Sequence, residues 1–421
     1  MRYDFLMNNK NKLKDGGIAR AFSSRNFRIF WYGHFSFIIG VWVNRVSIAW
    51  LTWELTNSEL WLGYMGAASM VPMLFLGPLS GATADRYGHR KQLQIASAMG
   101  GLVTLILAIM VFTDRITPEV LLFLTFLGGG TRAFTVPARN AMVHSLVGKK
   151  DISAVIAVNA ASYHSGNFIG PAIAGGVLAA GGVSIALFAY SAIAIGVALL
   201  YNLLDICDEG NQKKDRKALL SELSEGFRYA YNHEGIRNVM ILTAVVTLFL
   251  QPYMEMMPAF ATEVFNRAVD GFAILQASAG LGAMIGGLWL AQRGRTQGLT
   301  RILLISTFGG VCSVTAFSQI DHFYFAMAAL FFVGISIVAA NIGSLSLIQN
   351  SVDAKVRGRV MSLNGVLVTG GPALGATLIG TVAETYGVQT PVMVSALIGF
   401  VIWLVMVRPT AKITAELEKT D

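Results

Sequence analysis

Twelve apolar segments of roughly membrane-spanning length follow one another along this chain, and they limit its possible folds more than any other feature. A bilayer's hydrocarbon core is about 30 Å thick, so a crossing helix needs about 20 apolar residues. The segments are Phe30–Leu51, Leu60–Ala82, Leu93–Phe112, Val120–Ala138, Ile152–Ala180, Val183–Leu204, Val239–Phe260, Phe272–Ala291, Ile302–Phe317, Phe323–Leu345, Val360–Val382 and Val392–Val407. With 54% hydrophobic and only 13% charged residues, the chain cannot be an ordinary soluble domain. The sequence predicts an all-α membrane protein.

Positive charge is concentrated on one side of these segments. With the N-terminus in the cytoplasm, 28 of the 32 Lys and Arg residues fall in cytoplasmic tails and loops, among them Arg139. This distribution is expected because membrane insertion disfavours the translocation of positive charge. Arg115 and Arg267 fall in outside loops, whereas Arg45 and Arg132 fall within segments. We therefore predict a multi-pass protein of the bacterial inner (plasma) membrane with both termini in the cytoplasm.

Several classes of function are excluded by what the sequence lacks. The net charge of +8 is explained by loops that face anionic membrane lipid, and no nucleic-acid-binding pattern accompanies it. The sequence contains no phosphate-binding G-x-x-x-x-G-K-[ST] loop, metal-ligand cluster or nucleophile elbow. We expect no cofactor, no metal and no enzymatic activity. The polar first 26 or so residues lack the apolar core of a cleaved signal peptide, so we expect them to be retained.

A polar stretch divides the chain into two groups of six segments. Apolar residues at helical spacing between 219 and 231 predict a short amphipathic helix along the membrane surface. We expect an N-terminal tail at 1–26, a six-helix bundle at 27–204, a linker at 205–237, a second six-helix bundle at 238–408 and a C-terminal tail at 409–421.

The two groups of segments are related by an internal repeat. Residues 137–175 align without gaps to residues 338–376 at an offset of 201, and the matches include Asn140 with Asn341 and Gly170-Pro171 with Gly371-Pro372. Chance identity between abundant small residues is the alternative, but the Gly-Pro pair and the Asn lie at corresponding places. Such repeats are typical of transporters, whose substrate site lies between the two halves.

The sharpest motif is GATADRYGHRK at residues 81–91, in the turn after the second segment. Its glycines allow close helix approach and a tight reversal, and its carboxylate can accept charge-assisted hydrogen bonds. The motif resembles motif A of the major facilitator superfamily, with His89 in place of the usual Arg or Lys. The resemblance implies a latch that closes the cytoplasmic side, formed by Gly81, Asp85, Arg86, Gly88, Arg90 and Lys91. A merely basic turn on the cytoplasmic side is the alternative.

A second motif, GNFIGPAIAGG at residues 166–176, contains Gly166, Gly170, Pro171 and Gly175. Its proline removes a helix hydrogen bond, so the helix can bend and pack closely against a partner. It resembles motif C of the superfamily's antiporters, although Ala174 replaces one glycine of the usual form. The likeness favours export over import. A similar GGPALGA in the eleventh segment indicates that part of the pattern reflects helix packing alone.

A wider resemblance runs from about Arg25 to Arg408. The strings RNFRIFWYG, VNRVSIAWLTWELTNSELWLG, AFTVPARNAMVHSLV and VRGRVMSLNG resemble the branch that contains the enterobactin exporter and macrolide efflux proteins. The likeness implies the major facilitator fold, twelve helices in two pseudo-symmetric six-helix bundles. The fourth segment departs from the family's motif B, because Pro137 stands where a glycine is usual, which puts a proton-relay role for Arg132 in doubt.

Ionisable side chains inside a membrane are costly and therefore indicate sites. The candidates for proton or substrate binding are Glu255, Glu54, Arg45, Arg132 and His164, together with Asn341 of the repeat. Glu54 and Glu255 are separated by the repeat offset, so a symmetric carboxylate pair facing a central cavity is one hypothesis. The alternatives are an interfacial Glu54, a structural ion pair for Arg45 and a packing role for His164. Prolines on both sides of Glu255 predict an irregular helix there.

These observations predict a monomeric secondary transporter. We expect it to export a small amphipathic or siderophore-like molecule by alternating access, driven by protons that flow inward. An importer or symporter of a polar nutrient, and a transport-inactive receptor or assembly protein on the same fold, are the alternatives. The sequence does not identify the substrate.

Overall fold

A computed structural model describes residues 21–143, 146–147, 151–205, 219–353 and 356–418. This part of the chain is almost entirely helical and contains no strand, and eleven of its helices are long and apolar enough to cross a membrane. Residues 1–20, 206–218 and 419–421, which belong to the predicted tails and linker, lie outside the described residues. The prediction of an all-α membrane protein is confirmed.

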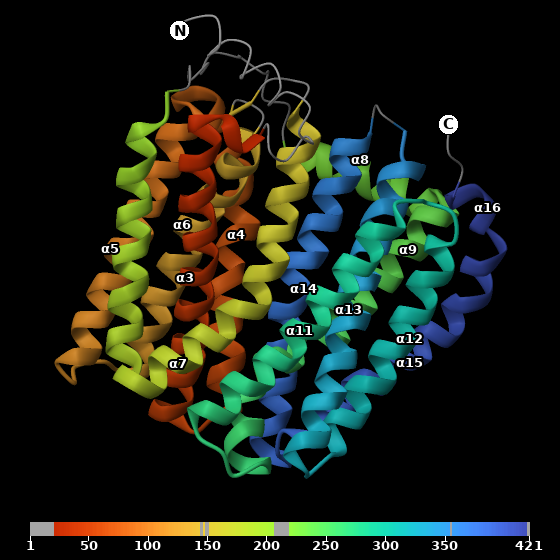
Figure 1. Ribbon diagram of the computed structural model, residues 1–421. Coiled ribbons are helices and arrows are strands. Elements are labelled where there is room, and N and C mark those ends of the chain that lie inside the picture. The colour runs from red at the N-terminus through yellow and green to blue at the C-terminus, as the bar shows by residue number, and fades with distance from the viewer. Residues whose placement is uncertain (1–20, 144–145, 148–150, 206–218, 354–355, 419–421) are drawn as a thin grey trace, which may run out of the picture.

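The first half contains five long helices for its six predicted segments. They are α3 (Arg25–Thr56), α4 (Glu59–Tyr87), α5 (His89–Phe112), α6 (Pro118–Met142) and α7 (Ile152–Leu200), followed by the short 3-10 helix η4 (Tyr201–Leu203). Helix α7 is 49 residues long and reverses direction at Gly182, whose φ of 74° suits glycine. Its two arms are visible in Figure 1 and correspond to the fifth and sixth predicted segments.

The second half begins with a broken crossing. This crossing consists of α9 (Glu234–Ala244), the π-helix η5 (Val245–Leu250), the 3-10 helix η6 (Gln251–Met254), α10 (Met257–Ala259) and the π-helix η7 (Phe260–Val264). Pro252 and Pro258 lie in η6 and α10 and cannot donate backbone hydrogen bonds, so the predicted irregularity around Glu255 is confirmed. The remaining helices are α11 (Val269–Arg293), α12 (Leu299–Gln319), α13 (Phe323–Ser351), α14 (Arg357–Tyr386), α15 (Gln389–Lys412) and α16 (Thr414–Leu417).

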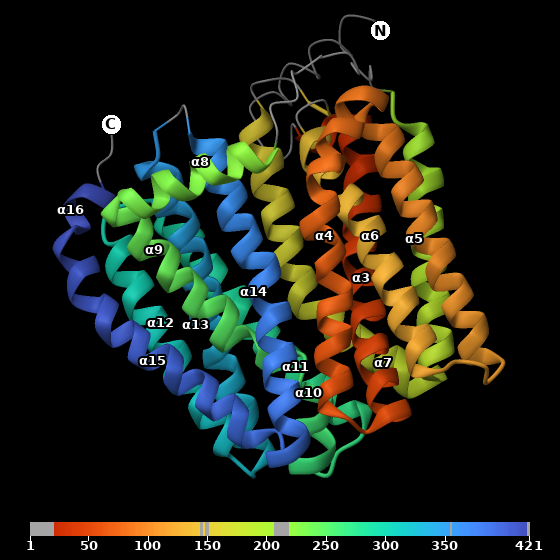
Figure 2. The same cartoon turned by 180° about the vertical axis from the view of Figure 1, so that it is seen from behind.

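The helices form two bundles that lean against each other, as Figures 1 and 2 show. Helices α3–α7 pack together in one bundle and α9–α15 in the other, and the bundles meet through α4 with α14 and α7 with α11. The start of α3 and helix α16, at the two ends of the described chain, lie at the same end of the molecule, which we term the termini end, and the opposite end is the far end. Helix α8 (Leu219–Asn232) agrees with the predicted amphipathic helix and crosses the termini end against α14 (Figure 2).

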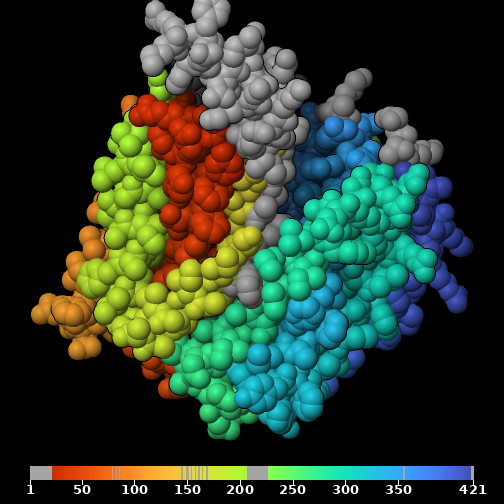
Figure 3. Space-filling view, viewed as in Figure 1, coloured from red at the N-terminus to blue at the C-terminus, as the bar shows by residue number. Residues whose placement is uncertain are grey.

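Small residues bring the two bundles into contact toward the far end. A Cβ atom at Gly63 of α4 would lie 2.7 Å from the carbonyl oxygen of Ala376 in α14, and one at Gly380 would lie 2.4 Å from that of Glu59. Figure 3 shows α7 and α11 adjoining in the lower part of the same interface. Toward the termini end, in contrast, a Cβ atom at Gly81 or Gly358 would meet no described atom within 4 Å. The closest contacts between the bundles at these glycines therefore lie toward the far end.

Candidate functional site

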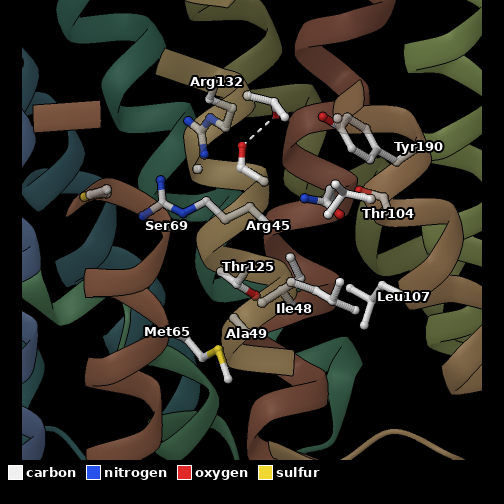
Figure 4. Close-up of a pocket in the computed structure, with 18 of the residues that line it drawn as sticks. Arg45, Ile48, Ala49, Met65, Ser69, Thr104, Leu107, Thr125, Arg132 and Tyr190 are labelled. Atoms are coloured by element: carbon white, nitrogen blue, oxygen red, sulfur yellow. Dashed lines mark hydrogen bonds between the residues drawn. The ribbon is translucent and has the colours of Figure 1, made fainter. Parts of the chain in front are cut away.

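A cavity lies among the helices of the first bundle at mid-height, and the second bundle contributes one residue, Glu255, to its wall. Part of it is open to solvent. Helices α3, α4, α5 and α6 form most of its wall, with Tyr190 from α7 and Glu255 from the broken crossing. Its polar lining includes Asn44, Arg45, Ser69, Thr104, Arg132 and Glu255. Figure 4 shows Arg45 and Arg132 reaching toward one side of the cavity, with Tyr190 and Thr104 on the other.

An ion pair joins the two bundles at this cavity. Nη2 of Arg45 lies 2.5 Å from Oε1 of Glu255, and the two side chains are 28% and 12% exposed. The Arg45 guanidinium also lies 5.3 Å from the centre of the Trp42 ring. A Cβ atom at Gly66 would lie 3.1 Å from Cγ of Glu255, so α4 also approaches this carboxylate closely. The sequence predicted each of these two charged residues as a candidate, and the structure brings them together.

Arg132 lines the same cavity, and no counter-ion for it occurs among the described residues. No hydrogen bond or ion pair of its guanidinium occurs within the described residues, although it lies within electrostatic range of Arg45 and Glu255. Seven residues on, Arg139 lies on the same face of α6. Its Nη1 is 3.3 Å from Nδ1 of His34, and its guanidinium is 5.3 Å from the Phe37 ring centre.

The prediction that Arg139 lies in a cytoplasmic loop is wrong. Helix α6 continues through Pro137 to Met142, so Arg139 belongs to the helix and faces α3. Proline is tolerated inside membrane helices because neighbouring groups satisfy the freed backbone carbonyl. His34 also went unnoticed in the sequence. The spacing of Arg132 and Arg139, about two helical turns, is the signal that could have found this face.

Two other predicted candidates, Glu54 and Asn341, lie apart from the cavity. Glu54 is exposed near the far end and accepts a hydrogen bond of 2.6 Å from Nε1 of Trp50, so it does not face Glu255 across a cavity. The expected symmetric pair is not formed, because α3 carries Glu54 about two turns beyond Arg45. The buried Oδ1 of Asn341 in α13 has no hydrogen-bond partner among the described residues. The side chain of His164 lies outside the part that the structure describes.

The GATADRYGHRK motif connects helices within the first bundle. Gly81 lies in α4, and Gly88 has a φ of 88° at the junction with α5. Arg90 donates hydrogen bonds of 2.7 and 3.0 Å to the carbonyl oxygens of Leu204 and Asn202, beyond the end of α7. Arg86 and Lys91 are exposed, and the Asp85 side chain lies outside the described part. In this arrangement the described contacts of the motif tie α5 to α7.

The GNFIGPAIAGG motif packs against two different helices. A Cβ atom at Gly166 or Gly170 would overlap Ile38 or Trp42 of α3, at 2.2 and 2.6 Å. Through Trp42, this contact supports the position of Arg45. Pro171 is buried within α7. A Cβ atom at Gly175 would lie only 2.1 Å from Cβ of Ala273 in α11, across the interface between the bundles.

A cluster of carboxyl groups, which the sequence analysis did not predict, lies where the bundles meet at the far end. Oγ of Ser58 donates a hydrogen bond of 2.7 Å to Oε2 of Glu384, which joins α4 to α14. The carboxyl groups of Glu59, Glu263 and Glu384 lie within electrostatic range of one another. Like charges so close repel each other, and a proton on one of the groups relieves this repulsion.

We expect this far-end contact to weaken as the pH rises through neutrality. Glu263 lies in η7, beyond the spanning segment that ends at Met254, and partial burial together with Glu59 and Glu384 raises its pKa to about 7. The closed contact binds a proton more tightly than the open form, so raising the pH from about 6 to about 8 removes stabilisation from the closed form. Distances between spin labels on the far ends of α4 and α14, measured in nanodiscs, should show a severalfold loss of the closed population.

Glu263→Gln should make this population independent of pH, because the amide imitates the protonated acid. Glu119→Gln, at an exposed glutamate in the first turn of α6, serves as the control and should retain the pH dependence. A pH dependence that persists in Glu263→Gln would rule out this cluster as its source.

Comparisons with known proteins identify a family and several relatives of this chain. Residues 18–420 match the model of a family described as transmembrane secretion effector. The staphyloferrin A transporter of Staphylococcus aureus is 21% identical over 94% of this chain and 98% of its own length. The enterobactin exporter of Citrobacter koseri is 24% identical over 89% and 88%, and the multidrug efflux pump Tap of Mycolicibacterium fortuitum is 25% identical over 82% and 86%.

Solved structures share the fold at low sequence identity. The nucleoside transporter NupG has a TM-score of 0.70 at 16% identity, covering 91% of this chain and 98% of its own. The D-xylose-proton symporter has a TM-score of 0.71 at 10% identity, covering 90% and 97%. The predicted major facilitator fold is thus confirmed.

Proposed function

Because the chain belongs to the transmembrane secretion effector family of major facilitator transporters, we propose that it exports a small amphipathic or siderophore-like molecule in exchange for protons. It is a multi-pass membrane transporter and not an enzyme. The names of its relatives, which refer to staphyloferrin A, enterobactin and macrolide or multidrug efflux, support this range of substrates.

The proposal of proton coupling rests on the Arg45–Glu255 ion pair. It connects α3 of one bundle to the broken crossing of the other, beside the cavity. A proton on Glu255 neutralises the carboxylate and leaves only a weaker hydrogen bond to Arg45. Loss of the proton restores the attraction between the bundles. Proton binding can therefore change how strongly the bundles are held together at the substrate cavity.

The contacts between the bundles support alternating access. In the described state the close glycine contacts between the bundles lie toward the far end. With the termini in the cytoplasm of a bacterial cell, as the distribution of Lys and Arg indicates, this state opens the cavity to the cytoplasm. A substrate would enter there and leave after the far end opens. We assign the GATADRYGHRK motif to closure of the cytoplasmic side.

The proposal is tested by transport into inside-out membrane vesicles that contain the protein. Staphyloferrin A, enterobactin and erythromycin are suitable substrates because the relatives' names point to these classes. We expect a proton gradient to drive accumulation of at least one of them, an uncoupler to stop it, and vanadate to leave it unchanged. Accumulation that follows ATP and ignores the uncoupler would contradict the proposal, as would inward transport by intact cells.

A further inference from the structure

We propose that the cavity selects substrates with anionic oxygen donors, such as carboxylates or catecholates, and that Arg132 is the principal binding residue. This inference rests on the proposed export function and specifies the charge of its substrate. It begins from the charges in the cavity wall, which in the described part are Arg45, Arg132 and Glu255. Since Arg45 and Glu255 neutralise each other, the cavity retains one positive charge.

An unpaired guanidinium in such a place indicates an absent anion. Withdrawing a charge from water is costly unless a counter-ion and hydrogen bonds compensate for it. Arg132 has neither among the described residues, yet it lines a cavity that is partly open to solvent. A guanidinium presents paired N–H donors that match the two oxygens of a carboxylate or a catecholate. An anionic ligand would supply the missing partner.

A second positive charge lies on the same helix beyond the cavity wall. Arg139 follows Arg132 on the same face of α6, at a helical rise of about 10 Å. Its described contacts are the His34 ring nitrogen and the Phe37 ring, neither of which is a carboxylate. If Arg139 donates to Nδ1, that nitrogen is an acceptor and the His34 ring is neutral. The described contacts of Arg139 therefore add no negative charge to this face of α6.

The rest of the wall suits the organic part of such a ligand. Asn44 contributes a buried Oδ1 that has no partner among the described residues, and Tyr190 and Thr104 contribute hydroxyl groups. Met65 and Leu107 add apolar surface. A cationic drug would meet the opposite situation, because it would face Arg132 and would have to displace Arg45 from the one carboxylate in the described wall.

Equilibrium binding to purified protein in nanodiscs, without any gradient, tests this inference. The ligands are enterobactin and citrate as anions and erythromycin as a cation, and the readouts are intrinsic tryptophan fluorescence and the thermal unfolding midpoint. We expect the anions to bind and Arg132→Gln to weaken their binding about tenfold or more, as expected for the loss of a charged hydrogen bond. Arg132→Lys should retain part of the affinity because it keeps the charge.

The matched control is Arg115→Gln, which removes an exposed arginine from a far-end loop and should leave anion binding unchanged. An unchanged unfolding midpoint without ligand shows that each variant is folded. The inference is overturned if the anions do not bind, if Arg132→Gln binds them as the wild type does, or if erythromycin binds more tightly than either anion.

The inference and the proposed function fail in different ways. Anion binding that depends on Arg132, without gradient-driven accumulation, would sustain this inference and contradict the proposed function. Uncoupler-sensitive accumulation of erythromycin, with no anion bound, would sustain the proposed function and contradict this inference.

Discussion

Glu255→Gln is expected to abolish gradient-driven accumulation of substrate while substrate exchange across the membrane continues. The carboxylate is the acidic partner of the ion pair that joins the bundles at the cavity. An amide can accept a hydrogen bond from Arg45, but it cannot bind and release a proton in the working pH range. Exchange needs no net movement of protons, so it should survive. The variant should therefore behave as an uncoupled carrier.

The expected effect is large. For each proton exchanged, a tenfold proton gradient can sustain up to about a tenfold accumulation of substrate when the membrane potential is clamped at zero. In proteoliposomes, Glu255→Gln should lower that ratio to about one, while counterflow of labelled substrate stays within severalfold of the wild-type rate. Because Arg45 then lacks its counter-ion, equilibrium binding of an anionic substrate should be equal or tighter.

Glu54→Gln is the matched control, since Glu54 is the repeat-related carboxylate and lies outside the cavity. It should pump normally. If Glu255→Gln also pumps normally with an unchanged pH profile, Glu255 is structural and the proton site lies elsewhere. If both accumulation and exchange are lost, the ion pair is needed for movement of the bundles, and its role in coupling is not supported.

The membrane spans could be predicted from the sequence because each one is determined by the residues of its own segment. A run of about 20 apolar residues suffices to specify a crossing helix whatever surrounds it. Even the reversal near residue 182 was predicted, since the boundary drawn between the fifth and sixth segments coincides with Gly182. The break around Glu255 was likewise predicted, because proline removes a backbone donor wherever it stands.

The pairing of side chains could not be predicted, because it depends on contacts between distant parts of the chain. Arg45 and Glu255 are 210 residues apart, and Ser58 and Glu384 are 326 apart. A charged residue within a membrane span indicates a site, but its charge does not identify the residue that pairs with it. The repeat offset suggested a partnership of Glu54 with Glu255, and the actual partner of Glu255 lies about two turns before Glu54 on the same helix. The predicted fourth segment ended at Ala138 because the polar Arg139 and Asn140 follow it, whereas α6 continues to Met142.

Gly175→Leu is expected to prevent closure of the far end and to reduce transport at least tenfold, with normal membrane insertion. Gly175 of α7 packs against Ala273 of α11, and a Cβ atom there would lie 2.1 Å from Cβ of Ala273. Overpacking of this kind costs about 1–3 kcal/mol, which shifts a two-state equilibrium by roughly ten- to a hundredfold. The side chain fits only when the bundles separate at the far end, so the variant should remain open there.

Labelling of a cysteine between the bundles measures this shift. Thr377 lies in the contact between α14 and α4, so Thr377→Cys, in a background with both native cysteines replaced by Ser, reports access from outside the cell. Gly175→Leu should increase the rate of its reaction with an impermeant maleimide about tenfold or more. Gly176→Leu is the control, since a Cβ atom at the next glycine meets nothing within 4 Å and its residue is exposed. Equal labelling in the two variants would show that the far end opens and closes without the α7–α11 contact. Faster labelling in Gly175→Leu alone would assign the GNFIGPAIAGG motif to far-end closure, because the two substitutions add the same side chain to adjacent residues of one helix.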